Sequence, residues 1–271
     1  MSNPKKRVLF VSSEMSPFLD ESPLANLART LPQALQERDN EIRVLVPRFG
    51  VINERRNRLH EVVRLSGINI SIDDNDNPLI IKVASIPQTK MQVYFLDNED
   101  YFHRKAVYSD ESGKFFADND ERTIFFCKGV METVKKLGWA PDIIHCQGWM
   151  TSLIPLYLKT IYKNEPVFRN AKVIYSLHNE GDNFQNLGAD FARKASLNTI
   201  EQEQMGSFND ADLTGLHIGA VTHADAVVTL EDKVDLTLGD HLNSKPTMRH
   251  TDEGFEEQYV TFYEQLMSQV N

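Results

Sequence analysis

The chain has few cysteines, a deficit of positive charge and no long hydrophobic run. Its 271 residues include only two cysteines, Cys127 and Cys146, which are too few for a disulfide scaffold and typical of a reducing compartment. Lys and Arg number 29 against 39 Asp and Glu, and the net charge of −10 argues against nucleic acid or an anionic membrane as a partner. No segment resembles a membrane helix or a signal peptide. These features predict a cytoplasmic protein.

Patterns for metal and nucleophile chemistry are also lacking. The eight histidines show no metal-ligand spacing, and Ser12-Ser13 does not form a nucleophile-elbow motif. The acidic run from Asp73 to Pro78 lacks the glycine and the distal glutamate of an EF-hand loop, so it favours a solvated hairpin turn over a calcium site. We therefore expect neither a bound metal nor a cofactor.

The best-defined pattern lies between Arg7 and Arg48. A short apolar run at residues 8–11 is typical of a strand buried on both faces. Apolar residues then recur at helical spacing over 24–35, and a second β-branched run covers 42–46. This order predicts a strand, a crossover helix and a parallel strand. Because ligands bind at the carboxyl ends of such strands, the loop at residues 12–23 is the first place to look for a site.

Further patterns extend this unit into a larger sheet. Residues 68–72 alternate strictly between apolar and polar, and residues 79–86 and 91–96 supply two more strands, which together indicate a β-hairpin insertion. A short apolar strand at 143–146 is followed by a helical pattern, and Gly138 to Pro141 ends the helix before it. Another short apolar strand follows residue 171. The expected fold class is α/β: a Rossmann-like, mostly parallel sheet with helices on both faces and a β-hairpin insertion.

Five blocks of the chain also carry a resemblance to a known family. Their matching residues include Glu14, Pro17, Phe18, Leu31, Pro32, Pro47, Arg48, Tyr101, Arg104, Tyr108, Asp118, Asn119, Arg122, His145, Trp149, His178, Asn179, Gln185, Ala224 and Asp225. In this order they resemble the glycogen and starch synthases, ADP-glucose-type glycosyltransferases with two Rossmann-like halves.

The resemblance runs from about residue 7 to about residue 230. It implies one domain, residues 1–271, equivalent to the amino-terminal, acceptor-side half of the two-domain glycosyltransferase fold. Residues 231–271 then form a carboxyl-terminal extension. Its apolar residues lie at helical spacing and predict a terminal helix that docks on its own domain: Phe255, Tyr259, Phe262, Leu266 and Val270.

Two departures from the family pattern fall at reactive positions. Asp20 stands where the family has a lysine, and Ser22-Pro23 replaces its Gly-Gly pair. The glycines would let backbone N–H groups approach a phosphate, whereas proline removes one donor and Asp20 adds the wrong charge. Alternatively, Asp20 or Ser22 caps the helix with Pro23 at its first position, which equally argues against phosphate binding. Gln147 replaces a family histidine and cannot carry a proton.

The resemblance also supplies the candidate site residues. The catalytic candidates are Asp118, which corresponds to an active-site aspartate and alternatively caps a helix, and His178. Residue His145 is interpreted as a core histidine rather than a base. The substrate-binding candidates lie at strand ends and in loops, where they could hydrogen-bond or stack on a sugar: Arg48, Tyr108, Trp149, Asn179 and Gln185.

Three functions follow as hypotheses. The first choice is a degenerate, non-catalytic domain that binds an α-glucan or malto-oligosaccharide in the retained acceptor cleft. The first alternative is an active glucosyltransferase in α-1,4-glucan synthesis, with a partner chain supplying the second half. The second alternative is an interaction or regulatory scaffold, with a protein partner or a homo-oligomer, because fold alone does not set function.

Overall fold

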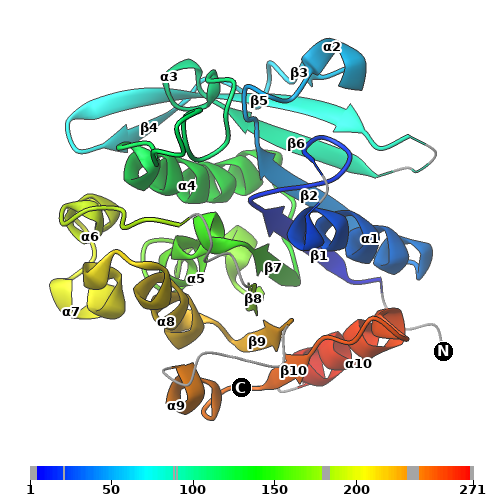
Figure 1. The fold of residues 1–271 in the computed structure, drawn as a ribbon. Coiled ribbons are helices and arrows are strands. Elements are labelled where there is room, and N and C mark those ends of the chain that lie inside the picture. Colours follow the sequence, from blue (N-terminus) through cyan, green and yellow to red (C-terminus); the bar gives the residue numbers. More distant parts are fainter. Residues whose placement is uncertain are drawn as a thin grey trace.

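The computed structural model describes residues 5–20, 22–87, 89, 91–178, 184–230 and 238–268. In these residues the strands form a 10-stranded sheet in the order β10-β9-β8-β7-β1-β2-β6-β5-β3, with β4 paired to β5 (Figure 1). The strands are β1 (Arg7–Ser12), β2 (Glu41–Pro47), β3 (His60–Glu61), β4 (Ile68–Ile72), β5 (Asn75–Ser85), β6 (Gln92–Asp97), β7 (Ile143–Gln147), β8 (Lys172–Leu177), β9 (Ala226–Thr229) and β10 (Thr247–Arg249).

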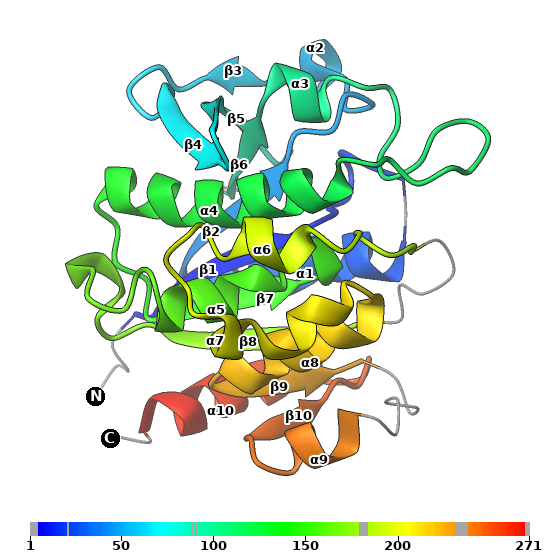
Figure 2. The same ribbon diagram turned by 90° about the vertical axis from the view of Figure 1, so that its left-hand side faces the viewer.

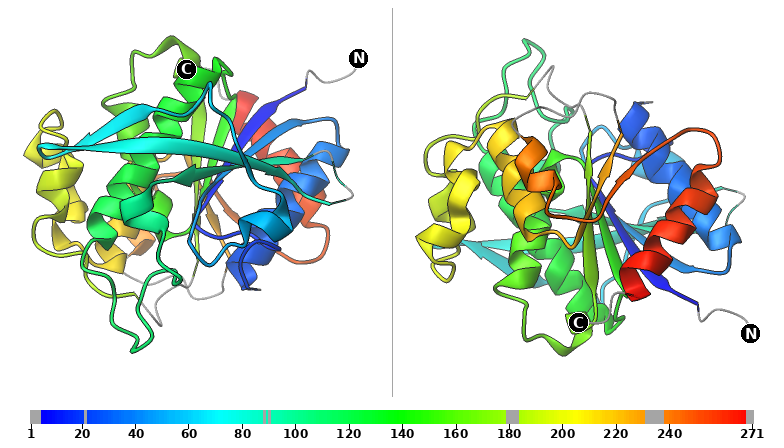
Figure 3. Two further views of the ribbon diagram at one scale, coloured as in Figure 1. Left: turned by 90° about the horizontal axis from the view of Figure 1, so that it is seen from above. Right: turned by 90° about the horizontal axis from the view of Figure 1, so that it is seen from below.

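Helices cover both faces of the sheet. They are α1 (Pro23–Glu37), α2 (Glu54–Asn57), α3 (Glu99–Phe102), α4 (Asn119–Leu137), α5 (Leu153–Lys159), α6 (Phe191–Ala195), α7 (Gln202–Met205), α8 (Leu213–His223), α9 (Gly239–Leu242) and α10 (Phe255–Ser268). Helices α1 and α10 contact each other on one face, while α4, α5 and α8 form a continuous layer on the other (Figures 2 and 3). The predicted fold class is confirmed.

The sheet is parallel from β10 to β6. Val8 of β1 pairs in parallel with Ile42 of β2 and with Ile143 of β7, which places the first βαβ unit at the centre of the sheet. Strands β5, β3 and β4 pair antiparallel beyond β6 and form the expected hairpin insertion. The turn of this hairpin is shorter than predicted. Residues 73 and 74 make the turn, and β5 already begins at Asn75.

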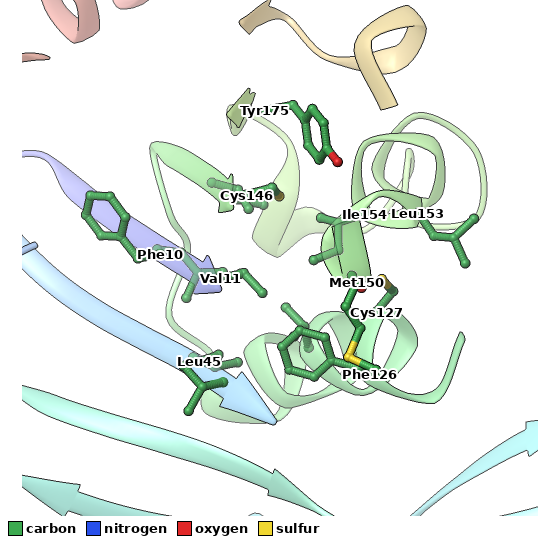
Figure 4. Close-up of a cluster of buried hydrophobic side chains, with 14 of the residues drawn as sticks. Phe10, Val11, Leu45, Phe126, Cys127, Cys146, Met150, Leu153, Ile154 and Tyr175 are labelled. Atoms are coloured by element: carbon green, nitrogen blue, oxygen red, sulfur yellow. Dashed lines mark hydrogen bonds between the residues drawn. The ribbon is translucent and has the colours of Figure 1, made fainter. Parts of the chain in front are cut away.

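Strand β1 runs through the middle of the core. The four residues 8–11 have no exposed surface, because helices cover both faces of the sheet at this position. Phe10, Val11 and Leu45 of the sheet lie in one buried cluster with Phe126 of α4 and Met150 (Figure 4). Both cysteines belong to the same region and are buried unpaired thiols, as expected for a chain without a disulfide scaffold.

The carboxyl-terminal segment adds both a strand and a helix to this architecture. Strand β10 was not predicted, whereas the terminal helix was, and it is present as α10. Tyr259, Phe262 and Leu266 of the predicted stripe are buried against the domain, and Val270 lies outside the described residues. The Tyr263 hydroxyl also reaches His145 of β7, 2.5 Å away. Helix α10 is therefore an integral layer of the fold.

Within the described part of the chain, no helix combines the length and the apolar character needed to cross a lipid bilayer.

Candidate functional site

A cavity of about 590 Å³ opens at the carboxyl edge of the parallel sheet. It lies where loops leave β1, β7, β8, β9 and β10, which is the usual place for a ligand in a sheet of this type. Helix α1 and the loop before α4 close its sides. The residues that line it are Glu14, Ser22, Pro23, Leu24, Asn26, Leu27, Thr30, Tyr108, Phe115, Trp149, His178, Phe184, Leu230, His250, Asp252 and Phe255.

The amino-terminal end of α1 forms one wall and carries a side-chain cap. Ser22 adopts an extended backbone, and its hydroxyl accepts the N–H of Ala25 at 2.9 Å while donating to Glu14 Oε2 at 2.8 Å. Pro23 is the first helical residue and has no N–H to offer. Of the two predicted caps, Ser22 is therefore the one observed, and Asp20 is exposed and does not line the cavity.

The carboxylate beside this helix end is thus Glu14 rather than Asp20. A helix amino terminus attracts anions through its unpaired N–H groups and its dipole. Here the first turn already has a hydroxyl acceptor, a proline and a neighbouring carboxylate, so a phosphate would meet both a missing donor and like charge. In the sequence Glu14 is a family match but not a predicted site residue. Its position just after a buried strand is the signal that could identify it as one.

Aromatic rings form a second wall. The Trp149 ring centroid lies 5.1 Å from that of Tyr108, 5.0 Å from Phe184 and 6.0 Å from Phe115. Trp149 is only 2% exposed, so its neighbours cover most of its surface. The structure thus brings together the predicted residues Tyr108 and Trp149 with Phe184, and they present a composite apolar wall rather than one open tryptophan face.

His178 follows β8 and lines the cavity. Its side chain is buried, and its Nε2 has no hydrogen-bond partner among the described residues. Burial, with smaller contributions from the neighbouring His217 and His250, lowers the pKa of His178 to about 3. The imidazole is therefore neutral near pH 7 and offers one donor and one acceptor to a ligand.

Three lining residues come from the segment after β9 and were missed by sequence reasoning. His250 and Asp252 follow β10, and Phe255 begins α10. The three-residue β10 is too short to stand out in a polar stretch, and no motif marks the residues that follow it. Only the pairing of β10 with β9 brings them to the cavity.

Asp118 does not line the cavity. Helix α4 begins directly after it, but its side chain makes no capping hydrogen bond and instead forms a two-point ion pair with Arg104. Asp118 therefore occupies the predicted N-cap position, but its side chain does not make the hydrogen bond of a cap. The guanidinium of Arg104 holds both carboxylate oxygens, which leaves Asp118 away from the group formed by His178 and the aromatic wall.

Two further substrate-binding candidates lie outside the cavity lining, and a third lies outside the described residues. Arg48 is buried in an ion-pair network with Glu54 and Asp97 that Lys82 also joins. Gln185 is exposed, with its amide 3.5 Å from the Gly113 carbonyl. The third, Asn179, belongs to a segment that the structure does not describe.

The strand end at β7 is buried and distinct from the cavity wall. His145 is fully buried, and its two ring nitrogens face Tyr263 and Ser176, so it has the satisfied core environment expected for it. Gln147 is also fully buried, and its amide has no partner among the described residues. Gly148 has a φ of 89°, and a Cβ there would overlap the Ser13 hydroxyl. Both features favour a glycine at this position.

The residues present do not suggest a metal centre. Among the described residues, no group of three or more His, Cys, Asp or Glu side chains is arranged to hold a metal ion. The chemistry available in the cavity is hydrogen bonding by neutral imidazole, hydroxyl, amide and carboxylate groups beside apolar rings.

A Rossmann-like domain with a cavity at the carboxyl edge of its sheet defines an α/β ligand-binding architecture. Comparison with known proteins identifies the family. A profile of the starch synthase catalytic domain matches residues 7–235. The chain is 41% identical over 229 residues to a glycogen synthase of Chlorobaculum tepidum, covering 84% of this chain and 46% of that protein. It is 43% identical over 180 residues to a glycogen synthase of Pelodictyon phaeoclathratiforme, covering 66% of this chain and 37% of that protein. The chain therefore belongs to the glycogen and starch synthase family.

The fold agrees with that assignment. The catalytic domain of starch synthase IV from Arabidopsis thaliana, solved bound to ADP and acarbose, superposes with a TM-score of 0.74 over 90% of this chain and 51% of that chain, at 17% identity. The family resemblance seen in the sequence is confirmed. The chain spans less than half the length of the two glycogen synthases.

Proposed function

We propose that this chain binds a neutral α-glucan segment in the cavity at the carboxyl edge and does not hold the pyrophosphate of a nucleotide sugar at α1. The observation that carries the proposal is the capped end of α1, where Ser22 occupies the Ala25 N–H and brings the Glu14 carboxylate beside it. On this proposal the chain keeps the acceptor side of the synthase fold and is impaired in transfer.

The charge of the cavity supports a neutral ligand. Among the described residues that line it, the charged groups are Glu14 and Asp252, and none is Lys or Arg. Catalysis of transfer from a nucleotide sugar requires positioned positive charge or N–H donors against the leaving pyrophosphate. A glucan carries no charge, so two carboxylates can accept its hydroxyl hydrogens without repulsion.

The cavity lining combines apolar rings, which suit the face of a pyranose, with polar groups, which suit its hydroxyls. The cluster of Tyr108, Phe115, Trp149 and Phe184 gives apolar surface for the ring carbons. His178 and Asn26 supply hydrogen-bonding groups on other sides of the same cavity. A volume of about 590 Å³ lies within the range of small-ligand sites and accommodates a few sugar units.

The test is isothermal titration calorimetry of the purified chain with maltoheptaose and, separately, with ADP-glucose. We expect binding of maltoheptaose and none of ADP-glucose, and we expect His178→Ala to weaken maltoheptaose binding about tenfold. His60→Ala is the matched control, because His60 is exposed on β3 and does not line the cavity. Binding of ADP-glucose would contradict the proposal at α1, and failure to bind maltoheptaose would contradict it for the ligand.

A second candidate is an active α-1,4-glucosyltransferase. The 41% identity over 229 residues to a protein named glycogen synthase favours it. It requires the other half of the enzyme, which this chain does not match. Transfer of labelled glucose from ADP-glucose to glycogen, by this chain alone or after addition of a second-half protein, would establish it and displace the first proposal.

A further inference from the structure

The segment after β10 carries groups whose hydrogen-bonding capacity is unused. We propose that His250 and Asp252 form a hydroxyl-binding subsite of the cavity, and that α10 positions this subsite. The inference rests on the proposed function, because it assumes a neutral, hydroxyl-rich ligand. It concerns residues beyond 235, where the match to the starch synthase profile ends.

Strand β10 delivers His250 to the cavity edge. Met248 pairs with Val228 and Arg249 with Thr229, both in parallel, so β10 ends at the same edge of the sheet as its neighbours. The backbone N–H of His250 then donates to the Thr229 carbonyl at 2.8 Å, which extends the pairing by one residue. His250 consequently lies beside Leu230, and both residues line the cavity.

The ring of His250 is fixed in orientation but has an unused atom. It contacts the rings of Phe255 and Tyr259, with centroids 5.9 and 5.8 Å away. Its Nε2 lies 3.6 Å from Asp252 Oδ1, which favours the tautomer that carries the proton on Nε2. Its Nδ1 is then an acceptor, and it is buried without a partner among the described residues. A buried acceptor of this kind is costly unless a ligand hydroxyl or water satisfies it.

A second unused nitrogen belongs to the same cavity. His178 Nε2 is also buried without a partner among the described residues, and the side chain is 8% exposed. Both imidazoles line the same cavity. His178 Nε2 and the acceptor Nδ1 of His250 can each bind a ligand hydroxyl, and the exposed Asp252 carboxylate can accept a third.

Helix α10 positions the subsite through one side chain. Gln258 Nε2 donates to the Arg249 carbonyl at 2.6 Å, and its Oε1 lies 3.3 Å from the Thr251 backbone N–H. The amide therefore holds the residues on both sides of His250. The helix itself is anchored to the sheet by the contact of Tyr263 with His145. Gln258 is thus a positioning residue, since it reaches the ligand only through His250.

The experiment is calorimetry at pH 7.5 with three neutral probes, maltotetraose, cellotetraose and xylotetraose, on the full chain. We expect His250→Ala to weaken the tightest of these interactions about tenfold and Asp252→Asn to weaken it about threefold. The Asp252 side chain is exposed, so Asp252→Asn tests the subsite even if His250→Ala fails to fold. The matched control is His241→Ala on α9, which does not line the cavity and should leave affinity unchanged.

Gln258→Ala tests positioning. Gln258→Ala alone should weaken binding. The double variant His250→Ala/Gln258→Ala should bind no more weakly than His250→Ala, because the two residues act as one unit. Additive losses would contradict the positioning role.

The outcomes separate the two proposals. If a probe binds and neither His250→Ala nor Asp252→Asn changes its affinity, the subsite is wrong and glucan binding is unaffected. If maltotetraose does not bind but another probe does, with dependence on His250, the subsite stands and the glucan assignment fails. If no probe binds, both are overturned.

Discussion

The environment of Ser22 shows how two side chains alter what a helix end can bind. In the family pattern a Gly-Gly pair stands at this position, and here one hydroxyl satisfies the Ala25 N–H and orients Glu14. On the proposed function, the same atoms that stabilise α1 oppose the binding of a phosphate at this end of the helix. Serine and proline in place of the glycine pair stabilise the helix start.

Gly148 combines a positive φ with a close neighbour, the Ser13 hydroxyl. We expect Gly148→Ala to reduce the free energy of unfolding by about 2–4 kcal/mol, because alanine disfavours positive φ and its Cβ would overlap the Ser13 hydroxyl. Urea denaturation measures the change. The matched control is Gly67→Ala, which has a similar φ of 82° with no atom within 4 Å of the added Cβ. It should cost only about 1 kcal/mol. Equal losses would show that the contact with Ser13 is unimportant.

At the scale of elements, the cap of α1 makes a measurable contribution. We expect Ser22→Ala to lower the free energy of unfolding by about 1 kcal/mol, because the Ala25 N–H loses its acceptor. Ser22→Gly should cost only a few tenths of a kcal/mol, since solvent can reach the freed N–H beside glycine. Chemical denaturation of the three proteins compares them. A larger loss for glycine than for alanine would contradict the capping role.

Helix α10 offers a matched pair of tyrosines. Tyr263→Phe should destabilise the fold by about 1–3 kcal/mol, because it leaves a buried His145 nitrogen without its partner. Tyr259→Phe is the control. Its hydroxyl is buried without a hydrogen-bond partner among the described residues, so its removal should be neutral or slightly stabilising. Thermal and urea unfolding distinguish the two. If both substitutions were neutral, the contact with His145 would not anchor α10.

At the scale of the whole molecule, buried histidines set the response to acid. Burial lowers the pKa of His145 and His178 to about 3 and that of His217 to about 4, from an ordinary value of 6.5. Below pH 6.5 the unfolded chain binds protons that the folded chain does not. Stability is therefore complete above pH 6.5 and is lost as the pH falls toward 4.

The expected slope follows from that difference. Between pH 6 and 5 each of the three histidines should remove about 1 kcal/mol of stability. This pH interval lies above the ordinary pKa values of carboxyl groups. Urea unfolding at half-unit pH intervals measures it. His217→Gln changes one titrating group and should reduce the slope by about 1 kcal/mol per pH unit, whatever its effect on stability at pH 7.5. A slope unchanged by this substitution would show that His217 titrates alike in both states.

The extent to which sequence predicted this protein differs between elements and site. The strand at 8–11, the helix beginning at Pro23 and the hairpin insertion were predictable because their apolar spacing and caps are local properties of the chain. The family and its fold were predictable because matching blocks recur in order. The partners of charged side chains were not predictable. Asp118 forms an ion pair with Arg104, and Arg48 forms ion pairs with Glu54 and Asp97.

The sequence by itself determined the central strands, the long helices and the family that they resemble, since these depend on neighbours along the chain. Only the tertiary structure decided the composition of the cavity. His250 and Asp252 line the same cavity as His178 because β10 pairs with β9, and that pairing joins segments about 20 residues apart across a stretch with no periodic signal. The site is set by which strand ends meet at one edge, and that is a property of sheet order rather than of sequence.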